Sequence, residues 1–303
     1  MLWLVLALIV ASLYAINSIL DNYIADVIFK DKIPQAIKCF NGPFYLVVAI
    51  IIFLCFNIQS IGIESAMWLI GSGILCSLSS IPYYLALRSE EATSAVIFYQ
   101  LQPIFYLISG IFLFGEQISF SQICGFILIL IAPAIVVFSR KRPRSRRIEM
   151  SATIYFIAYV AINSISGIIS TRIGSSIDFP TMFFYFVLGR AIFDIFMTAM
   201  QPRWRQRFKY IWRRQGMKAI GTISLEQLIH IVTELTYRAA LIIGVAAITS
   251  VVTNVAELVM TFILGIVLTI IWPKFGREKL TRHVVIAHLL ATIVAIIGII
   301  ILQ

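Results

Sequence analysis

The feature that most constrains this chain is a series of ten apolar stretches, each about 18–25 residues long, that account for most of its length. A helix of that length crosses the roughly 30 Å hydrocarbon layer of a bilayer. Hydrophobic residues make up 60% of the 303 residues and charged residues only 13%, about half the charged fraction of a soluble domain. Because a backbone in lipid must satisfy its own hydrogen bonds, the stretches should be helical. We therefore predict an all-α integral membrane protein with ten transmembrane helices.

The expected helices are separated by short polar or basic segments. They cover residues 2–20, 35–57, 65–87, 92–114, 119–138, 151–172, 180–200, 218–240, 245–272 and 282–302. In its longest interpretation, the first helix extends through a polar segment to Phe29. The segment Gln201–Gly216 is rich in Arg, Trp and Tyr, so we expect it to lie on the membrane surface.

The two halves of the chain resemble each other. The five letters at 15–19 recur unchanged at 161–165, and a proline opens the second helix of each half, at 34 and 180. Further along, Tyr83-x-x-Ala86-Leu87 matches Tyr237-x-x-Ala240-Leu241, and Gly110 matches Gly265. Each copy holds five helices, an odd number, so the second copy must cross the bilayer in the opposite direction. We predict two inverted five-helix repeats, residues 1–138 and 151–303, joined by a basic linker at 139–150.

The net charge of +10 comes mainly from short loops. Of the 24 Lys and Arg residues, 20 fall in loops on one face and only Arg172 on the other, while three lie inside helices. Lys and Arg in such loops fix topology and contact anionic headgroups, so we expect a lipid partner and no nucleic acid. The positive-inside rule then places both termini outside the cytoplasm. Four widely spaced cysteines in apolar stretches predict neither a metal site nor a disulfide framework.

Residues 83–138 resemble the drug/metabolite transporter superfamily, EamA type. The matching positions are Ala86-Leu87, Ala92, Ala95, Pro103, Gly110, Gly115-Glu116, Gln122 and Gly125. The resemblance implies ten helices and the carriage of small metabolites across the inner membrane, with no universal catalytic motif. It also implies termini inside the cytoplasm, opposite to the charge count. In the second copy Glu257 and Leu258 stand where the first has Gln102 and Pro103, a departure from the pattern.

The eighth expected helix carries the most informative polar residues. Glu226, His230, Glu234 and Arg238 are spaced by four and form one stripe on a helix. A charge at mid-membrane costs at least about 2.5–3.5 kcal/mol, so the stripe must face protein or water. It is either an internal ion-pair ladder, with Glu234 and Arg238 neutralising each other, or a cavity wall that binds substrate or relays protons. A metal site on His230 and Glu234 would lack a third ligand nearby.

Six further residues are candidates for substrate binding. Glu257 has no basic neighbour within a helical turn, which favours it as a proton carrier, although Arg190 of the seventh helix, itself near Asp194, offers an alternative partner. The remaining candidates are polar side chains that would hydrogen-bond between helices or orient a substrate: Asn254 beside Glu257, Asn17 and Asn163 at equivalent places in the repeats, and Tyr99 and Gln102 before Pro103.

These features favour a secondary transporter that alternately exposes a midplane site. The mixture of acids, His, Arg and amides suits an amino acid or an organic cation. A lipid-linked sugar flippase of the same fold is the alternative, and a membrane-embedded enzyme is less favoured because the chain lacks a nucleotide-binding loop and an HExxH motif. We expect no cofactor, a monomer or homodimer, and protons as a candidate coupling ion. The site should be a central, solvent-connected cavity between the repeats.

Overall fold

The computed structural model describes residues 2–29, 33–86, 101–114, 119–139 and 150–271, with isolated positions between 286 and 301. Every regular element in these ranges is a helix, which confirms the all-α prediction. The α-helices are α1 (Leu2–Tyr23), α2 (Lys38–Cys55), α3 (Ile63–Ala86), α5 (Gln102–Phe114), α6 (Phe120–Ser139), α7 (Met150–Gly174), α8 (Phe179–Met200), α9 (Pro202–Ile243) and α10 (Ala246–Ile271). Most of the basic linker, the candidate Tyr99 and most of the last expected helix lie outside the described residues.

Several of these helices are long and apolar enough to cross a bilayer. Within the described ranges they number five, at Leu2–Asp21, Pro34–Cys55, Ile63–Ala86, Ile154–Gly174 and Phe179–Met200. Large apolar side chains project outward from them, such as Leu54 of α2, which is 75% exposed. An apolar outer surface of this kind is stable against lipid tails and not against water. The chain is therefore a multi-pass membrane protein.

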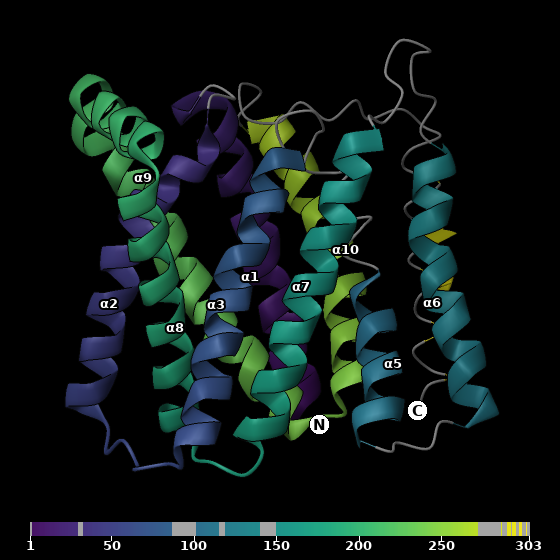
Figure 1. Cartoon of the computed structure of the whole chain (residues 1–303). Helices are drawn as coiled ribbons and strands as arrows, with labels where there is room; N and C mark the ends of the chain where they lie inside the picture. Colours follow the sequence, from purple (N-terminus) through teal and green to yellow (C-terminus); the bar gives the residue numbers. More distant parts are fainter. Residues whose placement is uncertain are drawn as a thin grey trace.

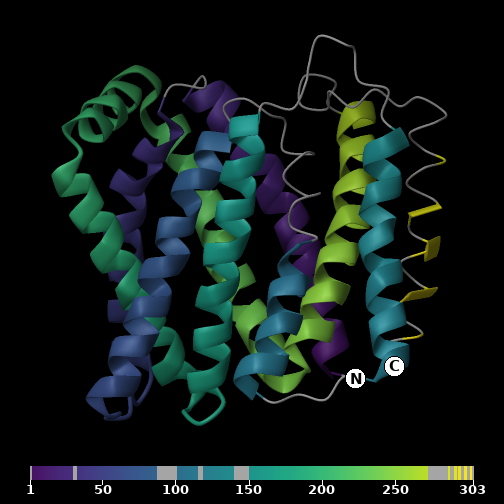
Figure 2. The ribbon, with the colours of Figure 1, turned by 45° about the vertical axis from the view of Figure 1, so that its right-hand side comes forward.

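The helices stand roughly side by side, as Figure 1 shows. Helix α1 packs against α9 and α10, α7 packs against α3 and α5, and α8 packs against both α2 and α3. Turning the view in Figure 2 keeps α3 and α7 adjacent, in line with their contacts. One of these contacts is polar, because the hydroxyl of Ser166 on α7 donates to the backbone carbonyl of Ser72 on α3 at 2.7 Å.

Helix α9 combines two segments that the sequence separated. Its first part was expected to lie on the membrane surface as a loop, but it is helical from Pro202, and the helix bends at Gly216. Gly216 has a φ of 57°, a left-handed conformation that glycine adopts without steric cost. Figure 1 shows the first part folded over one end of the bundle. There Trp212 is 52% exposed while Ile211 is buried, so the segment has one outward and one inward face.

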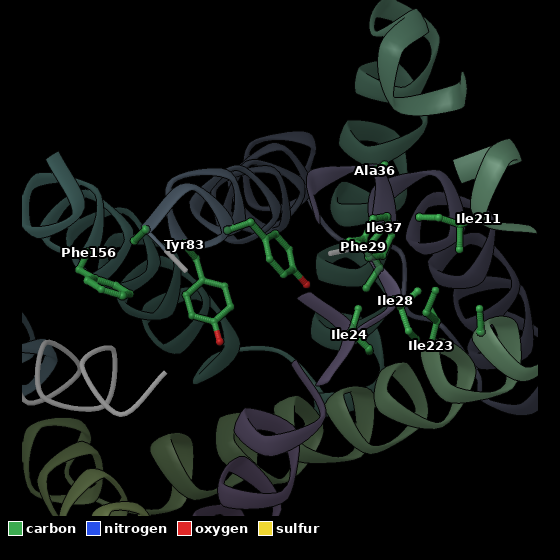
Figure 3. Packing of buried hydrophobic residues seen from close by; sticks show 12 residues of the cluster. Ile24, Ile28, Phe29, Ala36, Ile37, Tyr83, Phe156, Ile211 and Ile223 are labelled. Carbon is green, nitrogen blue, oxygen red and sulfur yellow. The ribbon is translucent and has the colours of Figure 1, made fainter. Parts of the chain in front are cut away.

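The end of the bundle beneath that segment is closed by an apolar cluster, shown in Figure 3. Helix α1 continues into a π-helix, Ile24–Ile28, and the chain returns through a 3-10 helix, Pro34–Ile37. The longest interpretation of the first helix, to Phe29, is therefore close to the observed end. Phe29 and Ile37 are fully buried there with Ile211 and Ile223 of α9. This packing joins the first half of the chain to the bend of α9.

Candidate functional site

Three residues of the α9 stripe, Glu226, Glu234 and Arg238, are buried in the bundle, and His230 is half-buried. Glu226 is 2% exposed, and Glu234 and Arg238 are each 5% exposed. The opposite face of the same helix is apolar and points outward, with Leu228 53% exposed. The helical period thus places the charges against protein and the leucines against lipid. Neither Glu226 nor Glu234 therefore faces lipid.

Glu234 and Arg238 form an ion pair within α9. Arg238 Nη2 lies 3.2 Å from Glu234 Oε2. Other helices hold both members, since the Tyr14 hydroxyl donates to Glu234 Oε1 at 3.4 Å and Arg238 donates to the Ser170 hydroxyl. The Arg238 guanidinium also lies 3.5 Å from the centre of the Phe186 ring on α8. Glu234 and Arg238 thus neutralise each other, as their four-residue spacing predicted.

His230 contacts Arg190 and not the acids of its own helix. Arg190 Nη2 lies 3.1 Å from His230 Nε2. The guanidinium lies over the Tyr45 ring of α2, 4.1 Å from its centre, and 5.9 Å from the centre of the Phe186 ring. Arg190 is 5% exposed and stands midway along α8. The suggested pairing of Arg190 with Glu257 is absent from the described contacts.

A buried ion pair that the sequence did not suggest joins α2 to α8. Lys38 Nζ lies 2.7 Å from Asp194 Oδ1, and both side chains are at most 1% exposed. Lys38 also donates to the carbonyl and hydroxyl of Ser77 on α3, at 2.8 and 3.0 Å, and the Ser77 hydroxyl donates to Asp194. Asp194 was placed beside Arg190 because they share a helical turn. Asp194 pairs with Lys38 and not with Arg190. The lysine ammonium is a compact charge on a flexible side chain, so it can reach the carboxylate from another helix.

Glu226 belongs to a second polar chain. Gln227 Nε2 donates to Glu226 Oε2 at 2.6 Å, and the Tyr45 hydroxyl donates to Gln227 Oε1 at 2.8 Å. Tyr45 therefore contacts Arg190 with its ring and Gln227, the partner of Glu226, with its hydroxyl. One tyrosine thus links the positively charged surroundings of Arg190 to the acid Glu226. Gln227 and Tyr45 are additional polar residues of the site, unmarked by any motif.

Helix α10 brings Asn254 and Glu257 into the interior, where each is 3% exposed. No described side chain forms an ion pair or hydrogen bond with the Glu257 carboxylate. Helix α10 packs against α1, which also carries Tyr14, the hydrogen-bond partner of Glu234. Glu257 is thus a buried acid whose described surroundings provide no cation.

The other polar candidates take different positions. Asn17 is buried on α1 and donates to the Thr233 hydroxyl on α9 at 3.2 Å, an interhelical hydrogen bond. Asn163, its counterpart in α7, is only half-buried. Gln102 opens α5 and is 9% exposed, while Tyr99 lies outside the described residues. Only Asn17 of these four has a described contact with the charged helix.

The described residues line a cavity at one end of the bundle. Its volume is about 290 Å³, and it lies between the end of α1 and the bend of α9, lined by Tyr23, Val27, Ile28, Gln215, Lys218, Ala219 and Thr222. The charged side chains described above are instead closed off from solvent. Within the same ranges, no three His, Cys, Asp or Glu side chains gather as a metal ion would require.

Comparisons with known proteins agree with this architecture. Residues 1–138 match the EamA-like transporter family. The EamA resemblance seen at 83–138 is therefore confirmed, and it implies a membrane transporter of the drug/metabolite transporter superfamily. One crystal structure is similar over 98% of this chain and 94% of its own, with a TM-score of 0.65 and 15% sequence identity. That identity supports the fold alone. No match was found among the curated proteins.

Proposed function

We propose that this EamA-type chain is a secondary transporter that moves a small polar or amphipathic metabolite across the cytoplasmic membrane. The observation that carries the proposal is the buried set of charges on α8, α9 and α10, sealed from lipid and solvent. Burying several charges in a membrane is costly, and charges kept there mark substrate or ion pathways. An occluded site of this kind fits one stage of alternating access.

We propose that the ten helices form two inverted repeats, and helix packing supports this. Helix α1 of the first half packs on α9 and α10, and its counterpart α7 packs on α3 and α5, the counterparts of α9 and α10. Tyr83 and Tyr237, matched in the sequence repeat, each contact a tyrosine of the helix that this exchange predicts. The ring centres lie 5.2 Å apart for Tyr83 and Tyr159 and 5.8 Å apart for Tyr237 and Tyr14.

Within the proposed site, the residues have different roles. Glu257 lacks a cationic partner among the described residues, so it is the acid best placed to gain and lose a proton during the cycle. Glu226 and His230 would contact the substrate. Glu234 and Arg238 are already paired, and they would shape the site. Coupling would then follow from protonation of Glu257 and substrate binding favouring different orientations of the repeats.

The proposal is tested with the purified full chain in proteoliposomes. Radiolabelled amino acids and organic cations are supplied outside, with and without an imposed proton gradient, and empty liposomes serve as the control. Saturable accumulation that protein-free liposomes lack is the expected result. Movement of a lipid-linked sugar between leaflets, without uptake of any soluble solute, would instead establish the flippase alternative.

A further inference from the structure

We infer that Arg190 is the binding group for a carboxylate of the transported substrate, an inference that rests on the proposed transport function. Arg190 stands midway along α8, is 5% exposed, and contacts His230 and two aromatic rings. Its Nε and Nη1 atoms have no hydrogen-bond acceptor in the described part of the chain. A guanidinium has five N–H donors, and these two atoms carry three of them.

The acids near Arg190 are engaged by other cations. Asp194, one turn along α8, is 2.7 Å from Lys38, and Glu234 is 3.2 Å from Arg238. Glu226 is hydrogen-bonded to Gln227. A buried charge without a paired partner is far more costly than one in an ion pair. No acid in the described part of the chain is therefore in direct contact with the Arg190 guanidinium, and an anion from outside the polypeptide could fill this place.

The surroundings of Arg190 fit a monocarboxylate attached to a small organic body. The guanidinium groups of Arg190 and Arg238 lie 5.9 and 3.5 Å from the centre of the Phe186 ring, so two cations share this region with the carboxylate of Glu234. One further negative charge would balance them. A dianion such as phosphate would leave an excess negative charge beside Glu234. Tyr45 and Phe186 offer apolar faces to the rest of the molecule.

A carboxylate-binding Arg190 decides between the amino acid and the organic cation that the polar residues of the site left open as substrates. An organic cation would place its positive charge beside Arg190, which is unfavourable at low dielectric. An amino acid remains suitable, because its carboxylate would bind Arg190 while the buried acid Glu226 could receive its amino group. The substrate is thus an amino acid or another small monocarboxylate, and not a simple amine.

The test measures binding through thermal stability, so that it does not depend on transport. The full chain in detergent is melted with alanine, with propionate (alanine without its amino group), with ethylamine (alanine without its carboxylate) or with inorganic phosphate, all at equal ionic strength. Alanine and propionate should raise the Tm of the wild type more than ethylamine or phosphate. Arg190→Met should lose that rise, and the exposed control Arg172→Met should keep it.

Stability without ligand is a second readout. Arg190→Met removes an unpaired buried charge and should leave the Tm unchanged or raise it, whereas Lys38→Met leaves Asp194 buried without its cation and should lower it. A fall in Arg190→Met as large as in Lys38→Met would make Arg190 a structural residue and overturn the inference. So would carboxylate stabilisation that survives Arg190→Met, that phosphate exceeds, or that is absent from the wild type. Carboxylate binding without uptake in proteoliposomes would count against the transport proposal alone.

Discussion

Replacing Gly73 by alanine should separate α3 from α8 and destabilise the protein. These two helices approach so closely that a Cβ at Gly73 would lie 2.0 Å from the backbone carbonyl oxygen of Phe186. The contact is reciprocal, because a Cβ at Gly189 would lie 2.1 Å from the carbonyl oxygen of Ile70. Small residues at helix crossings are the main way in which membrane helices gain close backbone packing.

The size of the effect follows from the atoms involved. An ordinary contact needs about 3.4 Å, so the carbonyl of Phe186 would have to retreat by roughly 1.4 Å, and a backbone atom cannot rotate away as a side chain can. Forced overpacking costs about 1–3 kcal/mol. Alanine returns about 0.5–1 kcal/mol through its better helix propensity. Because the clash is with backbone, the cost of overpacking should lie near the upper end of its range, about 3 kcal/mol. We therefore expect a net loss of about 2 kcal/mol at Gly73, and a similar loss at Gly189.

The same helix provides a matched control. A Cβ at Gly71 would meet no heavy atom within 4 Å, so Gly71→Ala should leave the stability unchanged or slightly increased. Thermal melting in detergent, with size-exclusion chromatography to check for intact protein, compares the Gly71, Gly73 and Gly189 variants. Equal melting temperatures for Gly71→Ala and Gly73→Ala would refute the close crossing of α3 and α8.

Three further predictions address the ion pairs, the coupling and the topology. Asp194→Asn should lower the stability by about 3–5 kcal/mol in a thermal melt, because Lys38 is left buried and unpaired. Lys38→Met combined with Asp194→Leu should recover much of that loss. An equal loss in the double variant would contradict the prediction. Glu257→Gln should abolish gradient-driven accumulation in proteoliposomes but leave counterflow exchange intact. Glu226→Gln should weaken both accumulation and exchange. Loss of exchange in Glu257→Gln would make Glu257 a binding residue. A C-terminal alkaline phosphatase fusion should be active and a green fluorescent fusion dark, and the reverse would place the C-terminus in the cytoplasm.

The inward face of α9 was predictable from sequence because one helical period determines it. Charges spaced by four must share a face, and in a membrane that face must be internal. The Glu234–Arg238 pair follows from the same local geometry, and the structure contains it. The first helix and the apolar spans were predictable for a similar reason, since length and hydropathy are local properties of the sequence.

Partners on different helices were not predictable in this way. Asp194 and Arg190 are neighbours on α8, yet Asp194 binds Lys38, which is 156 positions away in the chain. Arg190 is then left to His230 and Tyr45, a partnership that no local spacing encodes. The helical form of the segment after Pro202 was missed because its composition indicates a membrane surface location without specifying backbone conformation.

The distribution of charge between the halves explains why the family match leaves the substrate open. The matched range, residues 1–138, supplies the site mainly with neutral groups, such as the Tyr45 ring and the Asn17 amide. Its buried cation Lys38 is consumed by the ion pair with Asp194. The charges that would distinguish one solute from another come instead from the second half: Arg190, Glu226, His230, Glu234, Arg238 and Glu257. Under the proposed transport function, the first half would supply mainly the helical framework, and the charged side chains of α8, α9 and α10 would select the substrate.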